Sequence, residues 1–476
     1  MTSDNVKEPG IPKHILITAW AIALGAIAPM LDSTMVNIAV NQLTKDFHTT
    51  LDTIQWAITG YILALAIAVP VSGWLMNTFN GKKVFVGAVI AFGVISVLVG
   101  VSWDISSFIL FRLLQGFSAG VITTLMFTLL VKTTGQQYLG RVMAIVSTPM
   151  IFGPILGPII GGFIVQAASW QWIFFINVFI VLISAPFMMS KIPDFEPFNK
   201  ESKLDLVGII VLSSMSVALI YGITKAADHA TFNNHETILW MGIGLALAII
   251  YLVYNRIKSN QTVLPMNLFA HRNFAASSAG LFLANIAIMG PMLILPLFFQ
   301  TFRDFTMIQT AAALIPQGVG MLITRPFIGK MIDKVGAKYV LIASLILSLI
   351  GSIPFIFISD TTSMIWISVI LFIRGVSVGG ISLPLMSEAY TGLDSKQLPE
   401  AGVGINIIEN LGSSFGSAII ATSVATALQG LHPTIAHQLH GYHIGFLVAT
   451  IILALIFIPS LFLTNKKKAR NTPMLE

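Results

Sequence analysis

Long apolar stretches separated by short polar breaks run through almost the whole chain. Crossing the hydrocarbon core of a bilayer takes about 20 mainly apolar residues, and the stretches at 15–40 and 444–463 reach that length. The pattern predicts an all-α membrane protein with fourteen spans, whose two termini lie on the same side. The predicted spans are 15–40, 52–76, 83–101, 105–130, 140–165, 170–190, 204–225, 237–255, 273–300, 308–329, 338–358, 362–387, 400–426 and 442–463.

The composition excludes a water-soluble enzyme. Of the 476 residues, 55% are hydrophobic and only 10% are charged, whereas soluble proteins carry about 25% charged residues. The chain has no cysteine, which removes disulfides, thiol catalysis and thiolate metal sites. It also has no Walker loop, dinucleotide fingerprint or zincin pattern. We therefore expect no nucleotide, nucleic acid, metal or bound cofactor, and an ion or substrate gradient as the energy source.

The positions of the positive charges predict the orientation. If the N-terminus is cytoplasmic, the outer loops contain only Lys45, Lys225 and Arg303, and the inner segments collect far more Lys and Arg. Basic residues in short loops resist translocation, so we expect a multi-pass protein of the cell membrane with both termini cytoplasmic. The segment 1–14 has no small-residue cleavage site, so we expect the first span to be retained. The net charge of +6 reflects this orientation rather than an acidic partner.

Two short loops share one spaced pattern, which indicates an internal duplication. Each loop lies between the second and third spans of a six-span half, and duplicated halves around a midplane site are typical of secondary transporters. The residues that we expect at these gating loops are Gly73, Asn77, Lys82, Lys83, Gly329, Asp333, Gly336 and Lys338. The predicted domains are a cytoplasmic N-terminus 1–14, an N-terminal six-helix bundle 15–190, a linker with two inserted helices 191–272, a C-terminal six-helix bundle 273–463 and a basic cytoplasmic tail 464–476.

Charged residues inside the predicted spans are candidates for function, because charge in the bilayer costs several kcal/mol. At about 1.5 Å per residue, Asp32 and Arg112 lie at similar depth, roughly 12 and 10 Å below the outer face. We predict that they pair, and that hydration or substrate changes the protonation of Asp32. The alternatives are a fixed structural pair and an aspartate hydrated at the cavity mouth.

The same arithmetic predicts a second pair in the other half. Arg374 and Glu409 again lie at similar depth, roughly 18 Å from the outer face and 13 Å from the inner face of a core about 30 Å thick. In a low-dielectric cavity a carboxyl group keeps its proton more readily. Glu409 is therefore expected to carry a proton or to neutralise a cationic substrate, unless it only pairs with Arg374.

Two other sets of polar residues have simpler interpretations. Arg325 lies near the inner end of its helix, where its long stem can reach water, so we interpret it as an anchor. A group of histidines near the last outer loop could hold a metal, but the lack of a nearby carboxylate or cysteine favours a solvated loop. These histidines are His432, His437, His440 and His443.

Glycine and proline recur at four-residue spacing in the predicted fifth helix. Missing side chains let a neighbouring backbone approach closely, and we expect the region of Gly157 and Pro158 to pack against the opposite half and seal one end of the cavity. The repeated positions are Gly153, Pro154, Gly157, Pro158, Gly161 and Gly162.

Five motifs follow one another along the chain, beginning at Leu31-Asp32-Ser33-Thr34, Gln55-Trp56, Arg112-x-x-Gln115-Gly116, Gly153-Pro154 and Trp170-Gln171-Trp172. Together they resemble the motifs of the major facilitator superfamily, and within it the fourteen-span drug:proton antiporters of the EmrB/QacA type. The resemblance implies two six-helix bundles plus two inserted helices, which rock around a central cavity. The motifs place six candidate residues at the cavity: Asn37, Gln55, Trp56, Tyr61, Gln115 and Asn406.

The resemblance also implies a function. We expect efflux of small lipophilic, often cationic compounds in exchange for protons, by a monomer in the lipid bilayer. Two departures limit it. The loop 77–83 has other residues at the positions of the usual Asp, Arg and Gly, which weakens its charge relay, and Glu409 stands where many relatives have an Arg. Substrate charge and proton stoichiometry therefore stay open. The alternatives are an exporter or flippase of an endogenous metabolite or lipid, and a receptor or structural protein that transports nothing.

Overall fold

The computed structural model describes residues 11–146, 157, 160–199, 204–428 and 435–464, and these residues form helices and turns without any strand. The helices are α1 (Lys13–Asp46), α2 (Leu51–Thr78), α3 (Gly81–Gly100), α4 (Ile105–Val146), α6 (Trp172–Lys191), α7 (Leu206–Asp228), α8 (His235–Ile257), α9 (Arg272–Arg303), α10 (Met307–Val335), α11 (Ala337–Ser352), α12 (Met364–Ala389), α13 (Leu398–Leu428), α14 (Ile435–Leu455) and α15 (Phe457–Phe462). Short 3₁₀ helices are η1 (Met266–Ala270), η2 (Ile353–Phe357) and η3 (Ser395–Gln397).

Polar side chains define where several helices begin. Thr50, Asn80, Asp205, Asn234 and Thr306 each accept a hydrogen bond from a backbone N–H in the first turn of the helix that follows. Such caps satisfy donors that the helix itself leaves free. The polar breaks of the sequence therefore contain the N-caps at which the next helices begin.

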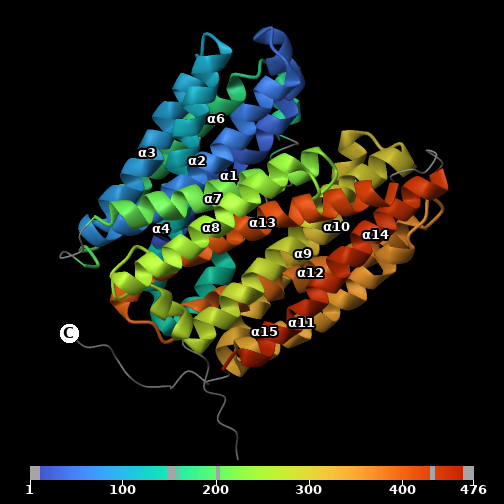
Figure 1. Cartoon of the computed structure of the whole chain (residues 1–476). Coiled ribbons are helices and arrows are strands. Elements are labelled where there is room, and N and C mark those ends of the chain that lie inside the picture. Colours follow the sequence, from blue (N-terminus) through green and yellow to red (C-terminus); the bar gives the residue numbers. More distant parts are fainter. Residues whose placement is uncertain (1–10, 147–156, 158–159, 200–203, 429–434, 465–476) are drawn as a thin grey trace, which may run out of the picture.

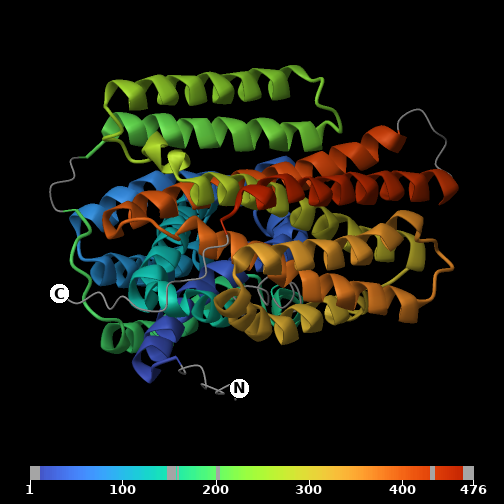
Figure 2. The same ribbon diagram turned by 90° about the horizontal axis from the view of Figure 1, so that it is seen from below.

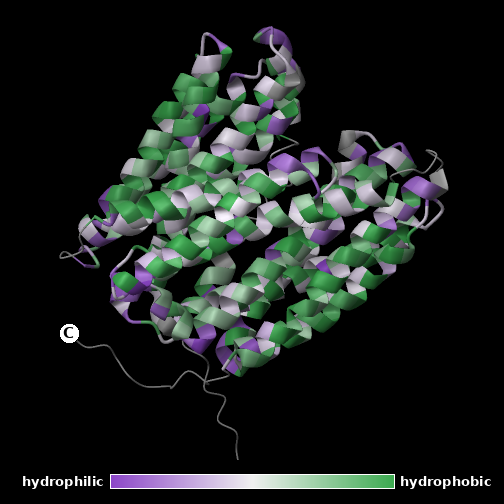
Figure 3. Cartoon of the chain, viewed as in Figure 1, coloured by the Kyte–Doolittle hydropathy of each residue, from purple (hydrophilic) through white to green (hydrophobic). Residues whose placement is uncertain are grey.

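Twelve helices in the described part of the chain are long and apolar enough to cross a membrane. Figure 3 shows the hydrophilic segments concentrated at helix ends and connecting turns. The predicted total of fourteen is not confirmed. Much of the predicted fifth span lies outside the described residues, and α10 is not among the twelve.

The helices form two groups with the same internal arrangement (Figure 1). In the first group, α1 and α3 each pack against both α4 and α6. In the second group, α9 and α11 each pack against both α12 and α14. The pairs α2–α4 and α10–α12 repeat in the same way. By these contacts α9 corresponds to α1, α11 to α3, α12 to α4 and α14 to α6.

The two groups meet at one end of the molecule. A Cβ added at Gly329 of α10 would lie 2.8 Å from the carbonyl oxygen of Gly140, near the end of α4. One residue after Gly140 and four residues after Gly329, Arg141 Nε donates to Asp333 Oδ2 at 2.9 Å. A Cβ at Gly73 of α2 would lie 2.6 Å from a side chain of α13. The helices of the two groups diverge toward the opposite end (Figure 1).

The inserted helices α7 and α8 pack against each other on one side of the molecule (Figure 2). Helix α7 also contacts α2 of the first group and α13 of the second. Ser213 Oγ donates to the carbonyl oxygen of Ile67 at 3.3 Å, and Thr422 Oγ1 of α13 donates to that of Ala226 at 3.2 Å. Helix α7 therefore bridges the two groups along one seam.

Candidate functional site

Asp32 and Arg112 form a buried ion pair, as the sequence predicts. Asp32 lies in α1, three residues after Pro29, and Arg112 lies in the first part of α4. Arg112 Nη1 is 2.5 Å from Asp32 Oδ2, and the two residues are 1% and 0% exposed. Breaking a buried pair by removing one partner is costly because the other charge stays buried, so each residue depends on the other.

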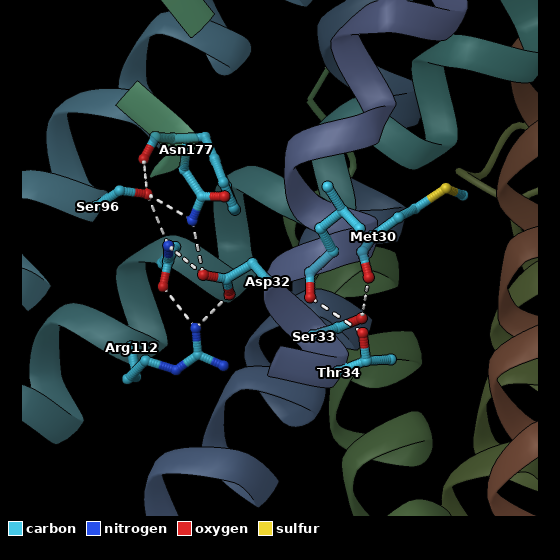
Figure 4. Close-up of polar contacts among 10 residues, drawn as sticks. Met30, Asp32, Ser33, Thr34, Ser96, Arg112 and Asn177 are labelled. Carbon is cyan, nitrogen blue, oxygen red and sulfur yellow. Dashed lines mark hydrogen bonds and ion pairs between the residues drawn. The ribbon is translucent and has the colours of Figure 1, made fainter. Parts of the chain in front are cut away.

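Neutral polar groups complete a network around the carboxylate (Figure 4). Asn177 Nδ2 of α6 and Gln115 Nε2 of α4 donate to Asp32 Oδ1 at 2.8 and 3.2 Å. Gln115 Oε1 accepts from Arg112 Nη1 at 2.6 Å, and Gln115 Nε2 also donates to Ser96 Oγ of α3 at 2.8 Å. The four helices α1, α3, α4 and α6 thus each contribute one or two side chains to one buried network.

Aromatic rings enclose the arginine of this network. The guanidinium carbon of Arg112 lies 4.2 Å from the ring centroid of Tyr61 and 5.7 Å from that of Phe174. A cation over an aromatic face is stabilised by the ring quadrupole. Tyr61 and Gln115 are only 3% and 0% exposed. Both therefore belong to the buried network rather than to an open cavity surface.

The opposite side of α1 is polar and exposed. Ser33 and Asn37 are exposed and one helical turn apart, so they share a face. Figure 4 shows Ser33 and Thr34 on the other side of α1 from Asp32. An exposed polar face inside a membrane span is expensive against lipid and is typical of a helix that lines a water-filled cavity. The cavity candidate Asn37 therefore lies on a different face of α1 from the buried Asp32.

Three other cavity candidates have different surroundings. Gln55 and Trp56 of α2 are exposed, and the Trp56 ring stacks on Tyr221 of α7 with centroids 5.8 Å apart. Asn406 of α13 is buried, and its Nδ2 donates to the carbonyl oxygen of Gly402 in its own helix at 3.0 Å. Trp56 therefore faces the inserted helices. The side chain of Asn406 is hydrogen-bonded to the backbone of its own helix.

The predicted pair of Arg374 and Glu409 is wrong in this structure. No ion pair joins these residues, and the side chain of neither makes a hydrogen bond within the described part of the chain. Arg374 is 3% exposed and lines a small cavity with residues of α9, α11 and α14. Glu409 is half-buried on α13, a helix that barely contacts α12. Matching depths fix the height of a residue but not the direction in which it faces.

The anchor interpretation of Arg325 stays a prediction, because the residue is half-buried. Its Nε and Nη1 atoms are enclosed and have no hydrogen-bond partner among the described residues. A Cβ at Gly379 of α12 would lie 3.3 Å from the Arg325 side chain. The missing side chain at Gly379 leaves room for the stem of Arg325 to lie against α12.

The glycines of the predicted fifth helix pack within the first group, so the predicted packing of Gly157 against the opposite half is wrong. A Cβ at Gly157 would lie 1.9 Å from Thr34 Oγ1, and one at Gly161 would lie 3.2 Å from the carbonyl oxygen of Met35. Both contacts are with α1, next to Asp32. At Gly162 the nearest atom would be 4.0 Å away. Outside the described residues lie Gly153, Pro154 and Pro158.

The two gating loops make different contacts. In the second half, Asp333 reaches Arg141 of the first group and Gly336 adopts φ 95° between α10 and α11, a conformation that favours glycine. Lys338 Nζ donates to the carbonyl oxygen of Leu461 at 2.8 Å. In the first half, the carbonyl oxygen of Asn77 accepts from the N–H of Asn199 at 3.2 Å, within its own group. Lys82 is half-buried and Lys83 is exposed.

The described histidines of this group, His437, His440 and His443, lie in helix α14 rather than in a loop. His443 Nε2 lies 2.6 Å from the carbonyl oxygen of Ile358. Among the described residues, no group of three His, Cys, Asp or Glu side chains could hold a metal ion. His432 lies outside the described residues.

Sequence reasoning missed three residues. Ser96 and Asn177 complete the network around Asp32, but a neutral polar residue in a span carries no charge signal that would single it out. Arg141 pairs with Asp333, but a basic residue outside the core of a span contributes only to the charge asymmetry of the loops. The resemblance includes the motif that contains Asn177, so that motif was the available signal.

Two equivalent helix groups, with a buried charge network in one of them, are the architecture of a secondary transporter. The profile of the Major Facilitator Superfamily matches residues 22–417. The chain therefore belongs to the major facilitator superfamily, a family of transporters rather than enzymes, and it is a multi-pass membrane protein with the all-helical fold of that family.

Relatives and solved structures agree with this assignment. The chain is 28% identical to the multidrug resistance protein B homolog of Mycobacterium tuberculosis, over 97% of this chain and 92% of that protein. It is 27% identical to the multidrug export protein EmrB of Escherichia coli, over 88% of this chain and 82% of that protein. The fold is similar to that of the human organic anion transporter MFSD10, with a TM-score of 0.63 at 13% identity over 96% of this chain and 100% of that one. The proton:xylose symporter XylE gives the same TM-score and identity over 94% and 96% of the two chains.

Proposed function

We propose that this protein is a proton-coupled multidrug efflux transporter that exports small lipophilic, often cationic compounds by alternating access. The observation that carries this proposal is the buried Asp32 network, because a carboxylate held by Arg112, Gln115 and Asn177 can change its partners when it gains a proton. The relatives named as multidrug exporters support the substrate class.

The proposed coupling follows from the contacts of Asp32. A proton on Asp32 removes the negative charge beside Arg112 and so weakens the ion pair. Arg112 can then form a hydrogen bond with another acceptor. Gly157 and Gly161 pack closely against α1 at Thr34 and Met35. Because no space separates them from α1, a shift of α1 also moves the helix segment that contains these glycines. Protonation of a single buried carboxylate thereby biases the arrangement of helices in the first group.

The proposed substrate path runs beside this network rather than through it. The exposed polar face of α1, with Ser33 and Asn37, offers hydrogen bonds, and the half-buried carboxyl of Glu409 offers an attractive charge for cations. A substrate on this face would be separated from Asp32 only by the thickness of α1. Substrate and proton would then act on opposite sides of the same helix.

The proposal includes a topology. We infer fourteen spans, with α10 and the predicted fifth helix added to the twelve apolar helices, in the order of two six-helix bundles joined by an inserted pair. Both termini are then cytoplasmic, in the cell membrane, and the end closed by Arg141 and Asp333 faces the cytoplasm. The arrangement in Figure 1 is accordingly outward-facing. The functional unit is a monomer.

The test is transport by purified protein in proteoliposomes with an imposed pH gradient, using a panel of cationic dyes, neutral amphiphiles, metabolites and fluorescent lipids. Proton-driven movement of dyes and amphiphiles supports the proposal, and movement of metabolites or lipids alone would overturn it in favour of an endogenous exporter or flippase. Asp32→Asn should abolish uphill export while dye binding persists. Full proton-driven export by Asp32→Asn would show that Asp32 is not the coupling site.

A further inference from the structure

The second helix group contains a buried cation at the place where the first group has its charge network. Arg374 lies in α12, which corresponds to α4, and the cavity beside it is lined from α9, α11 and α14, which correspond to α1, α3 and α6. Ser348 of α11 and Thr450 of α14 line this cavity as Ser96 and Asn177 surround Asp32. The arrangement of polar groups is therefore repeated, but one member is missing.

The missing member is the carboxylate. In place of Asp32, helix α9 contributes apolar residues to this cavity. The Arg374 side chain makes no ion pair or hydrogen bond with any described residue, although it is only 3% exposed. The acid Glu388 of the same helix lies fourteen residues away, which is roughly 21 Å at about 1.5 Å per residue. A guanidinium does not lose its proton in proteins, so this charge stays in the apolar interior.

The dimensions and lining of the cavity restrict what can neutralise Arg374. Its volume is about 10 Å³, which is space for one particle the size of a water molecule. Thr450 already donates its hydroxyl to the carbonyl oxygen of Phe446 at 2.7 Å. The hydroxyl of Ser348 makes no hydrogen bond to another described residue and is 1% exposed. Ser352 of α11 lines the cavity as well and is half-buried. The site thus offers one guanidinium, the buried hydroxyl of Ser348 and the half-buried hydroxyl of Ser352 in a pocket that is otherwise mostly apolar.

We propose that Arg374 and Ser348 bind a small monovalent anion of the size of chloride. A single anion supplies the negative charge that Asp32 supplies in the first group, and it fits a cavity that excludes sulfate or phosphate. A water molecule fits the same space but leaves the charge of Arg374 uncompensated, at the cost that burial of an unpaired ion carries. This inference does not depend on proton coupling or on the exported compounds.

The test is the thermal unfolding midpoint of the purified full-length protein while sodium gluconate is replaced by sodium chloride at constant ionic strength. A ligand that binds only the folded state raises the midpoint in a saturable way, and we expect a rise of roughly 2 °C or more. Bromide should act like chloride, and sulfate should have no effect. An identical midpoint in gluconate and chloride would overturn the proposal.

Variants locate the effect. Arg374→Gln should lose the chloride-dependent rise, whereas Arg325→Gln, which removes another enclosed arginine of the same group, should keep it. Ser348→Asp places a carboxylate beside Arg374, so its midpoint in gluconate should equal that of the unchanged protein in chloride, with no further rise. This variant keeps the test decisive if Arg374→Gln fails to fold. A full chloride-dependent rise in Ser348→Asp or Arg374→Gln would show that any chloride site lies elsewhere.

Discussion

The two helix groups use the same arrangement of four helices but balance their buried charge differently. Around α1 and α4, the cation of Arg112 and the anion of Asp32 are both parts of the chain and are 2.5 Å apart. Around α9 and α12, Arg374 is also buried, and no carboxylate of the described residues pairs with it. The comparison shows that the two groups share a scaffold and that both place polar side chains around a buried arginine. The presence or absence of one acidic residue decides whether the chain itself neutralises that arginine.

The difference also separates two kinds of polar site. The first network is filled by side chains, so it can change only by gaining or losing a proton or by moving its helices. The second leaves a cavity of about 10 Å³ beside its cation, so it can exchange a partner with the solution. The first group is therefore the better candidate for coupling, and the second for modulation by ions.

The largest expected difference in stability is that between replacing Arg112 and replacing Arg374. Arg112→Leu leaves Asp32 buried without its partner, so we expect the free energy of unfolding to fall by roughly 3–5 kcal/mol. Arg374→Leu removes a charge that has no partner in the chain, so in gluconate it should be neutral or stabilising. Both are measured by thermal unfolding in the same detergent. An equal loss of unfolding free energy in the two variants would contradict the view that only Arg112 is neutralised by an acid of the chain.

A smaller effect is expected from filling the contact between α1 and the glycine-rich helix. At Gly157 a Cβ would lie 1.9 Å from Thr34 Oγ1, so Gly157→Leu forces α1 away and should cost roughly 1–3 kcal/mol while it stalls transport. Gly162→Leu is the matched control, because its nearest atom would be 4.0 Å away. Transport assays and unfolding midpoints decide the outcome. Indistinguishable behaviour of the two variants would remove the role of this contact.

Glu409 sharpens the comparison because it is an acid in the second group that does not pair with Arg374. Glu409→Gln should reduce transport of cationic compounds by about tenfold, equivalent to roughly 1.4 kcal/mol, while neutral compounds continue to move. Glu400→Gln, nine residues earlier in α13, is the control for loss of a negative charge. Parallel transport assays with one cation and one neutral compound measure the selectivity. Equal loss for both compounds would exclude a cation site at Glu409.

The smallest effect is expected at Ser96, which links α3 to the Asp32 network. Its Oγ accepts from Gln115 Nε2 at 2.8 Å, so Ser96→Ala should cost about 1 kcal/mol and shift the pH profile of transport. Ser72 of α2 is buried as well but bonds only to the carbonyl oxygen of Ala68. Ser72→Ala should therefore leave the pH profile unchanged. A similar profile for both variants would show that Ser96 does not influence Asp32.

The sequence allowed the Asp32–Arg112 pair to be predicted because charge in a membrane is rare and helical rise gives depth. The same reasoning failed for Arg374 and Glu409, since depth carries no information on the face of the helix, and α12 and α13 hardly touch. Span positions follow from apolar runs, and the predicted span 308–329 corresponds to α10.

Helix α7 restricts how the two groups can move. It is hydrogen-bonded through Ser213 to Ile67 of the first group and through Ala226 to Thr422 of the second. A rigid helix that is bound to both groups cannot stay in contact with both when they rotate relative to each other. Any rocking of the groups must therefore break one of these hydrogen bonds or slide α7 along one partner. The inserted helices thus couple the motions of the two groups. Whichever of the two hydrogen bonds persists during rocking determines the group with which α7 and α8 move.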